Sequence, residues 1–400
     1  MLKNNEDCHC NSDILKPENK RITSSNVSIM SSMGNVTKDG TQSYFSLKEY
    51  EKAGYQLDEF VEDFVLTDAG YVPKVSVKMS KKDVISTIMV RLGIGRNNYK
   101  VTPGLYCVGN PDKDSEVLVT ANFKLSFDVL RKELDNINAY ILVLDTDGVN
   151  VWCAAGKKTF SSSELIKRIK MCALEKIVDH KRVIVPQLGA SGVSVKAVKK
   201  GIGFSVSFGP VRAEDIKIYL KNKRKTNREM RMVTFNFAER LILTPIEIMA
   251  AIQPFLIIAF IAIIISGLGP DIFSFSKAIL RGRLVIIALL TGIFSGVLVM
   301  PAFLPYIPFR NLAVKGIITG GIFSLFTFTA ASSLIQGFLE FAGLSLFTIS
   351  ISSFFAMNFT GTTPFTSPSG VEKEMKQFIP IQIILLVVSI IIWVYSGFLK

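Results

Sequence analysis

The run Ala139-Tyr-Ile-Leu-Val-Leu-Asp145 decides the fold of the first half of the chain. It is a nearly continuous, β-prone apolar segment, as expected for a strand that is buried on both faces of a sheet. Three further apolar runs predict strands at residues 116–123, 182–187 and 204–209. Helical spacing predicts helices between and after them, at residues 124–136, 161–177, 193–200 and 213–220. This alternation indicates an α/β fold with a Rossmann-like parallel sheet, in which ligands lie outside the carboxyl ends of the strands.

Charge and hydrophobicity are unevenly divided along the chain. The 400 residues include 46 Lys and Arg against 33 Asp and Glu, a net charge of +13, and 49% of them are hydrophobic. Residues 1–240 hold 38 basic and 28 acidic residues, a net +10, whereas residues 241–400 hold eight and five, a net +3. A charged, soluble-like part therefore precedes a membrane-like part. The composition excludes a collagen-like or wholly disordered protein, and five cysteines do not make a disulfide framework.

Five apolar segments are long enough to cross a membrane, so the last part predicts an all-α transmembrane domain of about five helices. They are residues 246–268, 284–304, 312–334, 338–359 and 378–399. The fourth is the least regular, because residues 345–353 are rich in polar side chains. We expect no charged residue deep in a span, and we expect Glu247, Gln253 and Glu340 to be interfacial.

A basic cluster at residues 217–240 directly precedes the first span. Such a cluster is compatible with nucleic-acid binding, but its position favours a cytoplasmic juxtamembrane stretch, so we expect no nucleic-acid partner. An apolar signal segment is missing from the start of the chain, which also favours a multi-pass protein of the cell (inner) membrane with its first part in the cytoplasm. The expected domains are a flexible polar tail 1–58, an α/β domain 59–220, a basic linker 221–240 and a transmembrane domain 241–400.

The octapeptide Asn150-Val-Trp-Cys-Ala-Ala-Gly-Lys157 is the most informative short motif. It follows the strand 139–145 and the turn Thr146-Asp147-Gly148, at the edge where this architecture binds ligands. Asn150 is a good N-cap and places Cys153 near the third position of a short helix, where free backbone N–H groups favour a thiolate. Lys157, four residues later, adds positive charge on the same face. The pattern predicts a reactive or metal-ligating cysteine; the alternative is a buried, inert thiol.

The other cysteines, the histidines and a short glycine motif say less about function. Cys8-His9-Cys10 offers soft metal ligands, but it lies in the polar tail without a second ligand pair. We expect Cys107 and Cys172 to be packing residues and His180 to be structural. The cysteines show no spacing typical of an iron–sulfur cluster. Gly93-Ile94-Gly95 lacks the third glycine of a dinucleotide site.

The residues 150–157 resemble the cap-helix motif of the mercury-methylating corrinoid proteins, the HgcA family. Similar segments are residues 103–111, 117–131, 141–150, 185–193 and 209–215, and with the five-span tail the resemblance covers roughly residues 75–400. The soluble part is also similar to the corrinoid domain of the large subunit of corrinoid iron–sulfur proteins. Cys107 departs from the family pattern. The histidine-bearing corrinoid motif Asp-x-His-x-x-Gly is absent from the sequence, so a histidine ligand to cobalt is not expected.

The resemblance implies a corrinoid-dependent methyltransferase that moves a methyl group from a methyl-cobalt corrinoid to Hg(II), forming methylmercury. The cofactor is then a cobalamin-type corrinoid, with Cys153 as catalytic residue and axial cobalt ligand. A thiolate opposite the methyl group makes that group more carbanion-like, which suits a soft electrophile. The implied cofactor contacts are Thr120, Asn122, Gly148, Asn150, Val151, Trp152, Cys153, Ala154, Ala155, Gly156, Lys157, Gln187 and Gly189.

The resemblance also implies partners. They are a ferredoxin-like protein with two [4Fe–4S] clusters as reductant, a methyl-folate-dependent methyl donor system, Hg(II) as substrate and the lipid bilayer. Two alternatives stay open: a corrinoid methyl carrier of one-carbon or acetyl-CoA metabolism with another acceptor, and a membrane transporter with a soluble regulatory domain.

Overall fold

The computed structural model describes residues 58–270, 272–361, 363, 366 and 368–399. The expected polar tail 1–58, with Cys8-His9-Cys10, therefore lies outside the described residues except for its last position. The described chain forms two compact units. One contains residues up to 90 and 95–233, and the other contains residues 91–94 and those from 234 onward.

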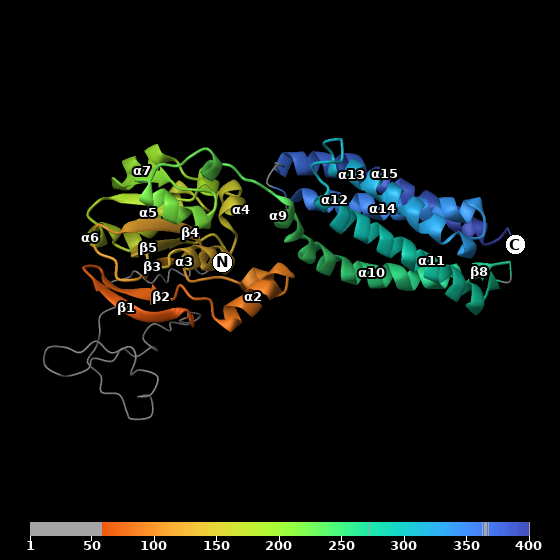
Figure 1. Ribbon diagram of the computed structural model, residues 1–400, viewed down its shortest axis with the longest axis horizontal. Coiled ribbons are helices and arrows are strands. Elements are labelled where there is room, and N and C mark those ends of the chain that lie inside the picture. The colour runs from red at the N-terminus through yellow and green to blue at the C-terminus, as the bar shows by residue number, and fades with distance from the viewer. Residues whose placement is uncertain (1–57, 271, 362, 364–365, 367, 400) are drawn as a thin grey trace, which may run out of the picture. The chain divides into compact units, whose positions relative to one another are not determined.

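The first unit is built on a seven-stranded sheet in the order β1-β2-β3-β5-β4-β6-β7 (Figure 1). Its strands are β1 Val61–Thr67, β2 Gly70–Val75, β3 Gly104–Val108, β4 Glu116–Ala121, β5 Ala139–Leu144, β6 Arg182–Val185 and β7 Ser205–Phe208. The strands β5, β4, β6 and β7 are mutually parallel. The predicted α/β fold is confirmed, and these four parallel strands are the four that the sequence predicts.

The remaining three strands extend the predicted parallel sheet and bring antiparallel pairs into it. β1 and β2 form an antiparallel hairpin, β2 runs parallel to β3, and β3 pairs antiparallel with β5. The sheet is therefore mixed, although mostly parallel. The hairpin lies at the sheet edge, and its first strand carries the adjacent charged residues Glu62 and Asp63, so it lacks the long continuous apolar run of a buried strand.

Helices cover both faces of the sheet. The unit contains α2 Lys81–Arg91, α3 Lys124–Glu133, α4 Val151–Gly156, α5 Ser162–Met171, α6 Leu174–Ile177, α7 Val195–Ile202 and α8 Ile216–Lys221. Short 3₁₀ turns are η3 Arg96–Asn98, η4 Gln187–Gly189, η5 Ala213–Asp215 and η6 Glu229–Arg231. Apolar side chains of α4, α5, α6 and α7 join one core, and those of α3 and α8 join the other. The predicted helix 161–177 is two helices, because Ala173 adopts a left-handed φ of 46°.

A buried ionic network within the first unit connects α2 to α3. Lys124 Nζ lies 2.7 Å from Asp83 Oδ1 and 2.6 Å from Asp128 Oδ2. Arg131, which is fully buried, donates from Nη2 to Asp83 Oδ2 at 2.9 Å and from Nε to Asp128 Oδ1 at 2.8 Å. Its Nη1 also donates to the carbonyl oxygen of Ser76. Two cations thus neutralise two carboxylates that burial would otherwise penalise.

Two carboxyl groups of this region have pKa values shifted in opposite directions. Burial alone would raise the pKa of Asp83, but hydrogen bonds and charge from Lys124, with hydrogen bonds from Ser80, outweigh it and hold that pKa well below its usual range. Burial raises the pKa of Asp58 to about 6 despite the opposing charge of Lys124, and the neighbouring carboxylates add to the rise. Asp83 therefore contributes stability that is present above about pH 4 and is lost as the pH falls through its lowered folded-state pKa. The raised pKa of Asp58 has the opposite effect: its contribution to the free energy of unfolding is present below about pH 4 and is lost as the pH rises through about 6.

Replacing Arg131 by Met should lower the free energy of unfolding of the first unit by about 3 kcal/mol or more, because two buried carboxylates would keep only one cation. The matched control is Lys132→Met, an exposed neighbour on the same helix. Denaturant titrations of the full-length protein, followed by hydrogen exchange of α3 peptides, measure both. Equal midpoints for the two variants would contradict the role of this network.

The second unit is helical. Its elements are α9 Phe237–Leu241, α10 Thr244–Ser266, α11 Phe275–Ile293, the π-helical turn η7 Phe294–Val299, α12 Met300–Ala302, α13 Leu312–Ala330, η8 Ser332–Leu334, α14 Phe338–Asn358, η9 Phe359–Gly361 and α15 Pro368–Ser396, with a small hairpin of β8 Leu268–Gly269 and β9 Ile272–Phe273. In the described part of the chain, five helical segments are long and apolar enough to cross a membrane. They are Phe237–Ser266, Phe275–Ala302, Leu312–Ala330, Phe338–Asn358 and Ser369–Ser396.

The polar residues of the fourth segment have a packing role. Ser352 Oγ donates to the carbonyl oxygen of Gly316 at 2.8 Å, and Ser353 Oγ donates to that of Ala313 at 3.0 Å. A Cβ atom on Gly316 would lie 2.5 Å from that of Ala356, so only glycine permits this approach of α13 and α14. Small residues and serine hydroxyls are the usual material of close helix contacts in membranes. The irregular composition of residues 345–353 therefore reflects a helix interface.

The helices of the second unit hold buried charges near their starts. Arg281 does not lie in a loop but in α11, where its Nε donates to Glu340 Oε1 at 3.2 Å. Both side chains are nearly fully buried between helices, and Glu340 lies in the first turn of α14, near the helix end where we expected it. Lys315 is buried on α13, and its Nζ donates to the carbonyl oxygens of Leu304 and Ile307. A satisfied ion pair of this kind is a common structural contact between helices.

Candidate functional site

The carboxyl ends of three parallel strands meet at one edge of the sheet. β4 and β5 are in register to their last residues, Ala121 and Leu144, and β6 lies on the other side of β4. The segments that leave these ends carry most of the residues singled out from the sequence. They begin at Asn122 after β4, at Asp145 after β5 and at Pro186 after β6.

Asn122 locks the end of β4 to the turn after β5. Its Oδ1 accepts hydrogen bonds from the backbone N–H of Thr146 at 3.1 Å, the hydroxyl of Thr146 at 2.9 Å and the backbone N–H of Gly148 at 2.9 Å. Its Nδ2 donates to Asp145 Oδ1 at 3.2 Å. Because the side chain is buried and engaged in this way, Asn122 holds the turn in place, and the geometry gives it a positioning role beneath the site.

The turn itself is left-handed and is also held from outside. Asp147 and Gly148 have φ values of 56° and 70°. A Cβ atom at Gly148 would lie 2.7 Å from the Lys100 side chain, so this position requires glycine on both grounds. Lys100 Nζ lies 2.6 Å from Asp147 Oδ1, and this hydrogen bond holds the pKa of the Asp147 carboxyl below its usual value. The two contacts fix where the next helix begins.

The cap helix α4 starts as the sequence predicts. Asn150 is its N-cap, and the Asn150 side chain accepts a hydrogen bond of 2.9 Å from the backbone N–H of Cys153, the third helical residue. The carbonyl oxygen of Cys153 in turn accepts from the N–H of Lys157 at 3.0 Å, which places these two residues one turn apart. Cys153 is half-buried and forms no disulfide, and Lys157 is exposed. The alternative of a fully buried, inert thiol at Cys153 does not fit this exposure.

The inner side of α4 is anchored in the core. Val151, Ala154 and Ala155 are buried there. The β6–α7 loop packs closely against the end of the helix. A Cβ atom on Gly192 would lie only 2.0 Å from the carbonyl oxygen of Phe160 and 3.2 Å from the Cα atom of Ala155, so only glycine allows this contact. In contrast, a Cβ atom on Gly156 would meet nothing within 4 Å. One side of α4 is therefore closed by packing, and the side at Gly156 is open.

The structure separates the expected cofactor contacts into two groups. Those on the accessible side are Trp152, Cys153, Gly156, Lys157 and Gln187, all half-buried or exposed. Those that are buried beneath them are Thr120, Asn122, Val151, Ala154, Ala155 and Gly189. Gly148 and Asn150 form the turn and the cap between the two groups.

Sequence reasoning missed the residues that support the turn from elsewhere in the chain. Lys100 belongs to the α2–β3 connection, and no local motif marks it. Glu164 on α5 accepts the backbone N–H of Asp145 at 3.0 Å through its Oε1. The capping-box position of Glu164 predicts a helix start, but a contact with β5 depends on the tertiary fold.

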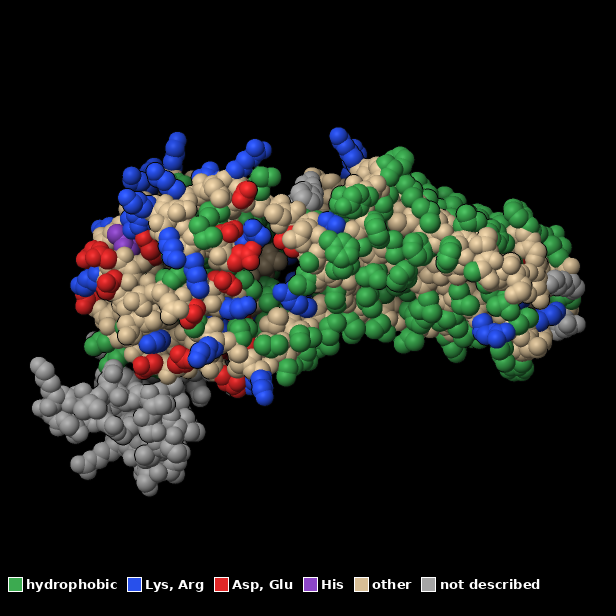
Figure 2. Space-filling model, in the orientation of Figure 1, with side chains coloured by type: hydrophobic (Ala, Val, Ile, Leu, Met, Phe, Trp, Pro, Cys, Tyr) green, Lys and Arg blue, Asp and Glu red, His purple; other side chains and the backbone are tan. Residues whose placement is uncertain are grey.

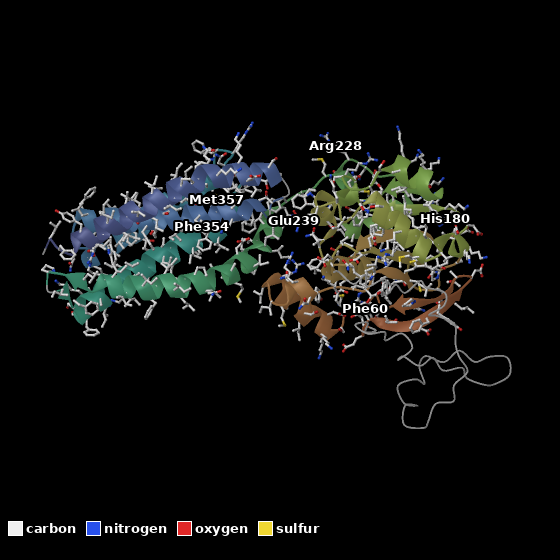
Figure 3. All side chains as sticks on the ribbon, turned by 180° about the vertical axis from the view of Figure 1, so that it is seen from behind. Phe60, His180, Arg228, Glu239, Phe354 and Met357 are labelled. Carbon is white, nitrogen blue, oxygen red and sulfur yellow. The ribbon has the colours of Figure 1, made fainter. Side chains whose placement is uncertain are left out.

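The other expected structural residues are confirmed. Cys107 is fully buried in β3, and burial raises the pKa of its thiol to about 12. Cys172 is fully buried in the same core as α5. His180 bridges the backbone, with Nδ1 accepting from the N–H of Arg182 at 3.1 Å and Nε2 lying 3.0 Å from the carbonyl oxygen of Ser115 (Figure 3).

Comparison with known families finds a match within the first unit. Residues 75–220 match the model of the family described as CdhD, the CO dehydrogenase/acetyl-CoA synthase delta subunit. These residues run from the end of β2 almost to the end of α8, so they contain the sheet edge and α4. We call residues 75–220 the CdhD-family domain because of this match, which covers about a third of the chain.

The CdhD-family domain is also similar to subunits of known complexes. Over 143 residues it is 29% identical to subunit gamma of the acetyl-CoA decarbonylase/synthase complex of Archaeoglobus fulgidus, covering 34% of this chain and 30% of the relative. The same subunit of Methanocaldococcus jannaschii is 36% identical over 98 residues, 24% of this chain and 20% of the relative. The corrinoid/iron–sulfur protein large subunit of Moorella thermoacetica is 29% identical over 164 residues, 38% of this chain and 36% of the relative. The matches thus span about a third or less of these relatives.

Replacing Asn122 by Ala should loosen the turn and the start of α4, because two buried backbone N–H groups would lose their acceptor at a cost of about 2–3 kcal/mol in unfolding free energy. Hydrogen–deuterium exchange of a peptide covering residues 145–157 should speed up. Asn97→Ala, at an exposed position of the same unit, is the matched control. Unchanged exchange in the Asn122 variant would show that the turn does not depend on this amide.

Proposed function

We propose that the CdhD-family domain binds a cobalamin-type corrinoid, and that the protein is a membrane-anchored corrinoid-dependent methyltransferase with Hg(II) as methyl acceptor. The observation that carries the proposal is the Asn150-capped helix α4, which presents half-buried Cys153 at the carboxyl edge of the parallel strands. Ligands of such sheets bind at that edge. The name of the Moorella relative, a corrinoid/iron–sulfur protein, supports the choice of ligand class.

The donor atoms near α4 fit this cofactor. Among the described residues, no group of three or more His, Cys, Asp or Glu side chains is arranged to hold a metal ion. A bare transition metal needs several protein ligands, whereas a corrinoid brings its own equatorial nitrogens and needs only an axial donor. Cys153 supplies one accessible sulfur, and the open side of α4 at Gly156 leaves room for a flat group.

The residues of the chain then have distinct roles. Cys153 would hold the cobalt through its sulfur and act as the catalytic residue, and the accessible residues Trp152, Gly156, Lys157 and Gln187 would contact the corrinoid. Asn150 fixes the position of Cys153 through the 2.9 Å hydrogen bond to its N–H. The charge of Lys157, one turn away, favours the deprotonated sulfur that ligation requires. When bound, the corrinoid supplies a cobalt centre that accepts and releases a methyl group.

Two features support Hg(II) as the acceptor. The octapeptide 150–157 resembles the cap-helix motif of mercury-methylating corrinoid proteins, and a thiolate ligand is a strong electron donor to the metal that it binds. A methyl group released with its bonding electrons requires a soft electrophile, and Hg(II) is one. Loss of a methyl group with its bonding electrons would leave the cobalt oxidised by two electrons relative to the state that accepts a methyl cation. A ferredoxin-like protein with two [4Fe–4S] clusters would supply these two electrons, and a methyl-folate-dependent system would then supply the methyl group.

The second candidate is a corrinoid methyl carrier of one-carbon or acetyl-CoA metabolism. The relatives named above favour it, because they are subunits of acetyl-CoA decarbonylase/synthase complexes or a corrinoid/iron–sulfur protein. A simple carrier has no need of the thiolate at Cys153, so that side chain distinguishes the two candidates. In both, the five long apolar helices anchor the protein in the cell membrane, with the CdhD-family domain in the cytoplasm.

Changing Cys153 to Ala should abolish methylmercury formation and alter the absorption spectrum of the bound corrinoid, because the cobalt loses its sulfur ligand. The full-length protein is purified anaerobically, reconstituted with cobalamin and assayed with Hg(II), a methyl donor and a reductant. Cys107→Ala is the matched control, since that thiol is buried in β3.

Each outcome of this assay separates the candidates. Wild-type activity in the Cys153 variant would refute the axial role. Corrinoid binding by the wild-type protein without methylmercury formation would favour the one-carbon carrier. Failure of the wild-type protein to bind any corrinoid would refute both candidates.

A further inference from the structure

The positive charge of the first unit is concentrated at one end of its sheet. Residues 182–231 hold twelve basic and three acidic residues, a net +9, whereas residues 58–181 hold eighteen and seventeen, a net +1. The former run from β6 through α7, the edge strand β7 and α8 to η6. We call this surface the β7 basic edge and define it by its exposed cations Lys196, Lys199, Lys200, Lys221, Lys223, Lys225 and Arg228. Figure 2 shows Lys and Arg side chains gathered where Figure 1 places α7, and Figure 3 labels Arg228.

The cations of the β7 basic edge have no acidic partners within the described chain. None of the seven forms an ion pair with another residue that the structure describes. Their neighbours Arg182 and Arg224 differ, because both lie against Glu116. Repulsion among unpaired like charges is unfavourable, so such a surface fits an anionic partner.

The edge is a folded surface and does not behave as a linker. Met230 is 4% exposed in the core beneath α8, and its carbonyl oxygen accepts the N–H of Val211 at 2.7 Å. Tyr219 of α8 is fully buried. The residues between α8 and η6, which the sequence suggested as part of a linker, are therefore held against the sheet with their cations outward.

Apolar side chains are exposed among these cations. Ile218 on α8 is 52% exposed, Val195 at the start of α7 is 38% exposed, and Met232 after η6 is 51% exposed. Apolar side chains between lysines are typical of surfaces that lie in the headgroup region of a bilayer, where the apolar groups enter the boundary and the cations contact phosphates. A nucleic acid would leave these apolar groups without a partner.

A short segment of the chain connects the end of the β7 basic edge to the first apolar helix. η6 ends at Arg231, and the first membrane-length segment begins at Phe237. The five residues between them span at most about 20 Å when extended, at roughly 3.5 Å per residue. A surface tethered so closely meets the bilayer at a high effective concentration.

We propose that the β7 basic edge binds anionic lipid headgroups of the bilayer that holds the five apolar helices. The proposal rests on the membrane location proposed above and is independent of the cofactor and the acceptor. Lysines and arginines near an anionic leaflet are attracted within about a Debye length of it, so the contact weakens in high salt. Membrane composition thereby controls how freely the CdhD-family domain meets its soluble partners.

Lysine labelling of the full-length protein in nanodiscs tests this inference. One set of nanodiscs contains phosphatidylcholine alone and the other contains roughly 30% phosphatidylglycerol. Modification of Lys196, Lys199, Lys200 and Lys221 by an amine-reactive reagent, read by mass spectrometry, should fall about fivefold in the anionic nanodiscs and recover in high salt. Lys78 and Lys132, exposed elsewhere on the same unit, should not change.

A charge-reversal variant provides the second arm. Lys196→Glu, Lys199→Glu and Lys221→Glu together should remove the protection of Lys200, whereas Lys78→Glu with Lys132→Glu should leave it. Equal labelling of the wild-type protein in both nanodiscs would overturn the proposal and leave this surface for an acidic protein. Protection in phosphatidylcholine alone would overturn its electrostatic basis. Failure of the chain to enter nanodiscs at all would instead refute the membrane location.

Discussion

One side-chain amide connects the core of the first unit to its candidate site. Asn122 stands at the end of β4, and its single oxygen accepts three hydrogen bonds from the turn that follows β5. Each bond adds only about 1 kcal/mol net, but a buried donor left without an acceptor costs about 1–3 kcal/mol, so the arrangement is strongly preferred. The turn directs the chain into α4, and α4 carries Cys153. The position of the sulfur therefore depends on an amide on a neighbouring strand.

The rest of the site can be understood as further restraint on the same helix. Lys100 holds Asp147 from outside the turn, Asn150 caps the first turn of α4, and Gly192 allows the β6–α7 loop to close against its far end. Each contact restricts a different part of a helix of only six residues, which would be unstable alone. A short helix held at both ends presents its exposed side with little freedom, as a ligand to a metal requires.

The sequence predicts the parallel strands well because burial on both faces leaves a nearly continuous apolar run, as in Ala139–Leu144. It predicts the start of α4 because an N-cap is a local signal, carried by Asn150. It does not predict β1, which carries the charged residues Glu62 and Asp63 at the sheet edge, or β3, whose antiparallel direction composition does not encode. The sequence also could not predict that Asn122 positions this turn, because its hydrogen bonds are to residues about 24 positions later in the chain. The same limit applies to Arg281, which hydropathy assigns to a loop although its partner Glu340 lies 59 residues away.

The buried pair of Arg281 and Glu340 has a consequence for biogenesis. Each residue is near the start of a different helix, α11 or α14, and either one alone would leave an unpaired charge in the bundle, at a cost below the roughly 2.5–3.5 kcal/mol that insertion scales give for a helix centre. During synthesis α11 emerges first and has no acidic partner until α14 follows. The early helices therefore gain from remaining near the insertion machinery until the later ones arrive, so this bundle should assemble as one cooperative set and not helix by helix.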